Sequence, residues 1–126
     1  MKTLRKKIAI AAVIFAFAGG SWFGLKKIWC KQRGAVFARR VESIRQDAHE
    51  RLKIGTKKPD ISQFFVEHGI PFEILESEAI GTLRTSGCAP LGCGTDSAII
   101  GVRVKLDAAG TVTTEPTVVG MYTDCL

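Results

Sequence analysis

The sequence has 126 residues, of which 46% are hydrophobic, and a net charge of +6. This length allows one domain at most beyond whatever the N-terminus forms, and the apolar content excludes a disordered chain. Residues 1–58 carry fifteen Lys and Arg against three acids, whereas residues 59–126 carry three against nine. A basic first half is typical of a segment beside an anionic membrane or of a nucleic-acid patch. Because the aromatic interleaving of single-strand binders is missing, we expect no nucleic-acid partner.

A basic N-terminus, residues 1–7, precedes a charge-free run at residues 8–25. As a helix this run is about 27 Å long, close to the roughly 30 Å of a hydrocarbon core. Trp22 and Trp29 suit an interfacial aromatic belt. The run is therefore predicted to be a transmembrane anchor or a signal sequence. Ala18 ends a small-x-small pattern of the kind that signal peptidase cleaves, so a cleaved periplasmic or secreted form is the alternative to a retained span.

Six basic residues follow the run closely, and we expect them at the membrane surface: Lys26, Lys27, Lys31, Arg33, Arg39 and Arg40. Counted alone, they place the following domain in the cytoplasm, where flanking Lys and Arg concentrate. Long domains translocate largely regardless of charge, however, and cysteine usage favours an oxidising compartment. We therefore expect a single-pass protein of the bacterial inner membrane with a periplasmic domain.

Residues 26–54 are predicted to form a basic amphipathic helix that Gly55 ends. The basis is one apolar stripe of helical period: Phe37, Val41, Ile44, Ala48 and Leu52. We expect the stripe to pack on the sheet of the domain, with anionic lipid as the alternative contact for this helix.

A small α+β domain is predicted at residues 55–126, and it begins with a short helix. Thr56 or Asp60 can serve as the N-cap of this helix, and Gly69 supplies the left-handed stop. His68 lies in the last turn, where a cation gains from the helix dipole.

Antiparallel strands follow where the apolar period changes to two. The expected strands are Phe72–Leu75, Ala79–Thr85, Ile100–Leu106 and Thr111–Val119, with a hairpin loop at Asp107–Gly110. The predicted fold class is therefore α+β: an N-terminal transmembrane or signal helix, then two helices packed on a three- to four-stranded antiparallel sheet.

The stretch Leu52-Lys53-Ile54-Gly55-Thr56, followed by Ile61, Phe64 and Gly69-Ile70-Pro71, resembles the SmpA/OmlA (BamE-like) group of small bacterial envelope proteins. That group is similar in placing a Gly-Thr helix start and a Gly-x-Pro exit before a small antiparallel sheet. The resemblance implies this architecture and a non-catalytic envelope module.

Two of the four cysteines lie in the glycine-rich stretch Gly87–Asp96. Four residues separate Cys88 from Cys93, whereas two residues separate the cysteines of a zinc knuckle or a thioredoxin-type pair. We expect a disulfide staple instead, formed within the set Cys88, Cys93 and Cys125. The pairing stays open. Cys30 could bond the domain cysteine that is left over, bond Cys30 of a second copy, or remain free.

Catalytic motifs such as Gly-x-Ser-x-Gly, the phosphate loop and His-Glu-x-x-His are absent from the sequence. We therefore expect no enzyme, cofactor or metal site. The predicted function is a membrane-anchored envelope protein whose domain serves protein interaction or envelope structure, with membrane lipid and an unidentified protein as partners and a homodimer as a further option. The alternative is a cytoplasm-facing basic domain that binds zinc or nucleic acid through reduced cysteines.

Overall fold

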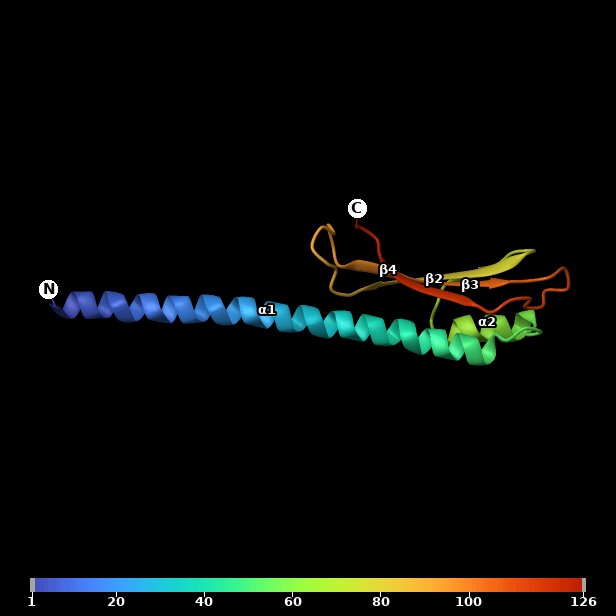
Figure 1. Cartoon of the computed structure of the whole chain (residues 1–126), viewed down its shortest axis with the longest axis horizontal. Helices are drawn as coiled ribbons and strands as arrows, with labels where there is room; N and C mark the ends of the chain where they lie inside the picture. Colours follow the sequence, from blue (N-terminus) through green and yellow to red (C-terminus); the bar gives the residue numbers. More distant parts are fainter. Residues whose placement is uncertain (1, 126) are drawn as a thin grey trace. The chain divides into compact units, whose positions relative to one another are not determined.

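The computed structural model describes residues 2–125. The chain divides into two compact units, one ending at Gln32 and the other beginning at Arg33. The elements follow in the order α1 (Lys2–Arg51), α2 (Lys58–Glu67), β1 (Phe72–Ile74), β2 (Glu78–Ser86), β3 (Ser97–Lys105) and β4 (Thr117–Tyr122) (Figure 1).

The expectation of an N-terminal helix followed by two further helices is wrong. The apolar run and the amphipathic segment predicted separately at 26–54 belong to one helix of 50 residues, which ends at Arg51. The residues that directly follow the apolar run, Lys26 to Gln32, contain no proline and are mostly good helix formers. Gly34 costs a helix only about 1 kcal/mol, which is too little to stop it. The chain thus folds as α+β with two helices and four strands.

The first unit is the apolar part of α1. Its large side chains are exposed in the structure, among them Phe15, Phe17 and Phe23. This helix contains a segment long and apolar enough to cross a membrane, and none of that segment is buried within the protein. A signal sequence near an N-terminus meets the same description.

The second unit is built on a four-stranded antiparallel sheet with the strand order β1-β2-β3-β4. Each strand pairs with its neighbour in sequence, and β2 and β3 pair along their full length, from Glu78 opposite Lys105 to Ser86 opposite Ser97. The second half of α1 and α2 lie on the same face of this sheet (Figure 1). The connections are therefore local, as in a meander covered by helices on one side.

The apolar stripe of α1 forms part of the core, as expected. Phe37, Val41, Ile44 and Ala48 are the buried residues of this helix. A Cβ atom added to Gly120 of β4 would lie 2.5 Å from Cγ2 of Val41 and 3.0 Å from Cζ of Phe37. The missing side chain at this position lets helix and sheet approach closely.

The short helix α2 buries Ile61, Phe64 and Phe65 completely. Its N-cap is Lys57, without a capping side chain, so the expectation of Thr56 or Asp60 in that role is wrong. Thr56 instead donates from Oγ1 to the carbonyl of Lys53 at 2.7 Å, at the end of α1. Proline next to Lys58 fixes the helical φ in the first turn and has no N–H group that would need a cap.

Two loop predictions have different outcomes. Gly69 adopts a left-handed φ of +64° after α2, as a helix stop requires. The strand expected at Thr111–Val119 is wrong, because β4 begins only at Thr117 and the earlier residues contribute only two isolated bridges, Lys57 with Thr111 and Leu106 with Val112. Pro116 explains the delay, since it has no N–H group to donate to a ladder.

Candidate functional site

The connection between β2 and β3, Gly87–Asp96, is here called the cysteine loop. The backbone N–H of Gly87 donates to the carbonyl of Asp96 at 3.0 Å and closes the base of the loop. Ala89 N–H donates to Oδ1 of Asp96 at 2.9 Å, and Cys93 N–H donates to the carbonyl of Pro90 at 3.2 Å. The loop is thus held internally by its own backbone and one carboxylate.

A disulfide joins Cys93 to Cys125, 32 positions later in the chain. Around it, Gly94 N–H donates to the carbonyl of Asp124 at 2.9 Å, and Thr95 Oγ1 donates to Oδ2 of the same residue at 2.5 Å. A crosslink over this separation stabilises a fold by about 3–4 kcal/mol in the chain-entropy model. The staple therefore joins the cysteine loop to the segment that follows β4.

The sequence left three pairings open among Cys88, Cys93 and Cys125, and the structure forms the one between the last two. Neither Cys30 nor Cys88 is a free thiol in the structure. The spacing of the cysteines along the chain does not distinguish these disulfide pairings. The pairing depends on the fold, which places Cys93 opposite Cys125 in an isolated β-bridge.

The cysteine loop also contacts the first residues of the second unit. Arg33 lies 3.6 Å from the carboxylate of Asp96, and a Cβ atom on Gly34 would lie 3.3 Å from Cβ of Cys88. Tyr122 accepts a hydrogen bond on its hydroxyl from Cys88 N–H at 3.0 Å. The base of the loop is therefore fixed to α1 near Arg33 and to the end of β4.

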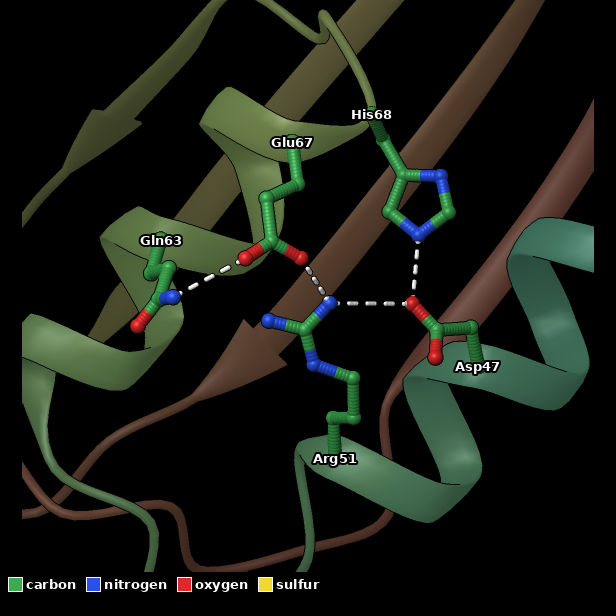
Figure 2. Close-up of polar contacts among 5 residues, drawn as sticks. All are labelled: Asp47, Arg51, Gln63, Glu67 and His68. Carbon is green, nitrogen blue, oxygen red and sulfur yellow. Dashed lines mark hydrogen bonds and ion pairs between the residues drawn. The ribbon is translucent and has the colours of Figure 1, made fainter.

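A second cluster of polar side chains joins the end of α1 to α2 (Figure 2). Nε2 of His68 lies 2.5 Å from Oδ2 of Asp47. Arg51 donates to the same carboxylate at 3.3 Å and also to Oε2 of Glu67. Gln63 donates to the other oxygen of Glu67 at 2.9 Å. We call these five residues the helix-junction network.

The electrostatics of the network favour a structural role. The hydrogen bond from Arg51, followed by the one from Gln63, lowers the pKa of Glu67 below its ordinary value. The hydrogen bond to Glu67 is likewise the main reason why the pKa of Arg51 is raised. Its ion pairs and hydrogen bonds tie the end of α1 to α2, as a clamp between the two helices does.

The six basic residues expected at the membrane surface divide between the two units. Lys26, Lys27 and Lys31 belong to the first unit, and the ammonium of Lys26 lies 5.6 Å from the ring centroid of Trp22. Arg33, Arg39 and Arg40 belong to the second unit, and all three are exposed. A cation beside tryptophan is a common arrangement where a helix leaves a membrane.

Within residues 2–125, no group of three or more His, Cys, Asp or Glu side chains is arranged to hold a metal ion. The disulfide occupies Cys93 and Cys125, and thiolates rather than disulfide sulfurs are the zinc ligands of proteins.

The sequence carries a local signal for only part of the helix-junction network. Asp47 and Arg51 lie four positions apart on α1. This spacing predicts an ion pair between them, but not their contacts with α2. The contact between Asp47 and His68 joins residues 21 positions apart, which only the packing of α2 on α1 brings together. His68 was assigned to the helix dipole, and its carboxylate partner was missed.

The comparisons with known proteins give no relative: no protein-family model, curated protein or solved structure matches this chain.

Proposed function

We propose that this protein is a membrane-anchored component of the bacterial envelope, and that its α+β domain serves protein interaction or envelope structure on the oxidising side of the inner membrane. The observation that carries the proposal is the Cys93–Cys125 disulfide in a domain whose core helix begins as an apolar membrane-length segment. The domain has no catalytic role in this proposal.

The membrane part of the proposal rests on the first unit. Eighteen consecutive uncharged residues end at Leu25 and are followed by Lys26 and Lys27. A retained anchor accounts for the apolar character that continues past Ala18, the residue after which signal peptidase would cleave. The apolar segment and the stripe that packs on the sheet are parts of the same helix, α1. In this proposal the domain is therefore attached to the bilayer without a linker.

The cysteine chemistry supports an oxidising compartment. Disulfides form and persist in the periplasm and outside the cell, and they are rare in the reducing cytoplasm. The staple ties the cysteine loop to the segment after β4, which suits a permanent structural bond in a small domain.

The interaction role is supported by the face of the sheet that the helices leave uncovered. Val119 and Met121 of β4 are exposed there, and Arg84, Arg103 and Lys105 are the only cations of residues 59–126. All five occupy strand positions that alternate with the buried ones. A face that mixes apolar and charged groups resembles the surface of non-obligate protein interfaces.

A fusion of alkaline phosphatase to the C-terminus through a flexible linker tests the orientation. The proposal predicts an active reporter in the membrane fraction, because this enzyme folds only where its disulfides form. An inactive fusion, paired with an active cytoplasmic reporter at the same site, would favour the zinc- or nucleic-acid-binding alternative. The intact mass of the native chain separates a retained anchor from cleavage after Ala18.

A further inference from the structure

The two edge strands of the sheet differ in how they are protected against pairing with another strand. β1 is three residues long, carries Glu73 at its centre and follows Pro71. A short strand, a charge and a proline are all devices that keep an edge strand from pairing. β4, at the other edge, is six residues long and contains neither a charge nor a proline. β4 is therefore the edge of this sheet that is suited to receive a further strand.

The pairing of β4 with β3 identifies the backbone groups on the outer side of β4. Thr123 N–H donates to the carbonyl of Ser97 at 3.0 Å, one position beyond the end of β4. In an antiparallel ladder, residues with backbone groups directed at the partner strand alternate with residues whose groups are directed away from it. The N–H and C=O groups of Val118, Gly120 and Tyr122 therefore point away from β3.

These outward groups are almost entirely unpaired. Arg45 of α1 donates from Nη2 to the carbonyl of Val118 at 3.2 Å, and no other residue of the described chain hydrogen-bonds to the outward groups. A carbonyl oxygen has two lone pairs, so Val118 can also accept a hydrogen bond from an added strand. An uncharged edge with unpaired backbone groups is a template for strand addition.

The sequence of β4 is self-complementary about Gly120. When two copies pair antiparallel with Gly120 opposite Gly120, Val119 of each copy lies opposite Met121 of the other on the uncovered face of the sheet. Val118 then lies opposite Tyr122 on the helix side. Val119 and Met121 are 41% and 49% exposed, so this pairing removes apolar surface from water.

The charges beside this edge do not oppose the approach of two copies. Arg45, which contacts the edge, also forms an ion pair with Glu42 at 2.5 Å, so its charge is balanced within each copy. A two-fold contact requires that one surface match itself in both directions, and β4 meets this requirement with Val119 and Met121. This two-way match favours a second copy over a strand of a different protein.

We propose that two copies of this chain associate through β4, which pairs with β4 of the second copy in an antiparallel ladder centred on Gly120. The inference names a partner for the interaction role proposed above and rests on that role, but it involves only the second unit and is independent of the membrane anchor. The two sheets join into one, and their uncovered faces become continuous. The contact is closed, because the same strand is used on both sides.

Charge variants of the exposed positions on β4 test the proposal on the full chain in detergent micelles. Val119→Lys with Met121→Lys places like charges opposite each other in the dimer, and Val119→Glu with Met121→Glu does the same with negative charges. The matched control is Ile54→Lys with Val66→Lys, because both of these positions are 69% exposed and lie outside β4. Sedimentation equilibrium measures the dimer dissociation constant of each chain.

We expect the wild-type chain and the control to form dimers of the same affinity. Each charge variant alone should dissociate at least about tenfold more readily, because like charges directly opposite each other destabilise a strand pair. An equimolar mixture of the Lys and Glu variants should recover the dimer, because opposite charges then meet at both positions. The Cys93–Cys125 crosslink, mapped in each variant, shows that the domain has kept its fold.

A monomeric wild-type chain overturns the inference. A dimer that both charge variants retain also overturns it, because the copies then associate elsewhere, for example through the apolar part of α1. Loss of the dimer without recovery in the mixture excludes the pairing of Val119 with Met121. None of these results bears on the proposed anchor and compartment, which the reporter fusion tests separately.

Discussion

The two halves of α1 have the same backbone and opposite side-chain arrangements. From Ile8 to Leu25 the helix is apolar on all sides, and its large side chains are exposed. From Phe37 to Ala48 only one stripe is apolar, and that stripe is buried against the sheet. The opposite side of this second half is charged.

The distribution of apolar residues around each half therefore indicates the environment in which that half is stable. A helix that is apolar on all sides requires an apolar environment around it, which a bilayer provides. A helix with one apolar stripe requires only one covered face and keeps water on the other. One continuous helix therefore joins an apolar segment to an amphipathic one without a loop between them.

The largest effect is expected from charging the first half. Val13→Arg together with Ile14→Arg should cost roughly 5–7 kcal/mol of membrane insertion, because each Arg near the centre of a span costs about 2.5–3.5 kcal/mol. We expect the chain to leave the carbonate-resistant membrane fraction. Val66→Arg with Ile54→Arg places the same charges on exposed positions of the second unit and should leave the fractionation unchanged. Retention of the first variant would break the comparison.

The next largest effect is expected from the buried stripe. Ile44 is 2% exposed, and Ile44→Ala should lower the free energy of unfolding by about 2–5 kcal/mol, because it removes packed methyl groups and leaves a cavity. Val36 on the same helix is exposed, and Val36→Ala should change it by less than about 0.5 kcal/mol. Urea unfolding of the detergent-solubilised chain measures both, and equal effects would contradict the burial of one stripe only.

Close packing between α1 and β4 predicts a contrast between two glycines of the sheet. Gly120→Ala should destabilise the domain by about 1–3 kcal/mol, because the new methyl group meets Val41 and Phe37. At Gly101 the nearest atom to an added Cβ is a carbonyl oxygen of Val119 at 3.9 Å, so Gly101→Ala should be neutral or slightly stabilising. The same unfolding experiment ranks the two variants, and the reverse order would place the helix elsewhere.

The smallest effect is expected from lowering the pH, which protonates Glu67 of α2 at its contact with Arg51. Because the pKa of Glu67 is lowered in the folded state, its contribution to stability is present above its unfolded pKa and is lost as the pH falls through the folded value. The stability of the wild-type domain should therefore decrease below about pH 4.5, and Glu67→Gln should remove that part of the decrease. Unfolding midpoints measured from pH 7 to pH 3 test this, and identical profiles would exclude Glu67 as a contributor.

The sequence supported much of the fold because its signals are local. The stripe from Phe37 to Leu52 and the alternation along β3 depend on neighbours within a few residues. The continuity of α1 was missed, because a change of hydrophobic pattern at Lys26 was interpreted as a break in the helix. The late start of β4 was missed in spite of Pro116, which is a local signal for it.

The candidate site was less accessible from sequence, because its contacts are long-range. The partner of Cys93 lies 32 positions away, and the partner of His68 lies on another helix. Neither contact has a spacing rule, so each follows only from the packed fold. The exposed position of Leu91 could not be distinguished from burial, because a short apolar stretch in a loop fits both.

Thiol mapping of carbonate-washed membranes tests the central claim most directly. Free thiols are alkylated before lysis, and the unreduced protein is digested and analysed by mass spectrometry. The account predicts a crosslinked peptide that contains Cys93 and Cys125 in the membrane pellet, from a chain that still carries residues 8–25. Alkylated Cys93 and Cys125, or recovery of the chain in the soluble fraction only, would contradict a disulfide-stapled domain anchored on the oxidising side of the membrane.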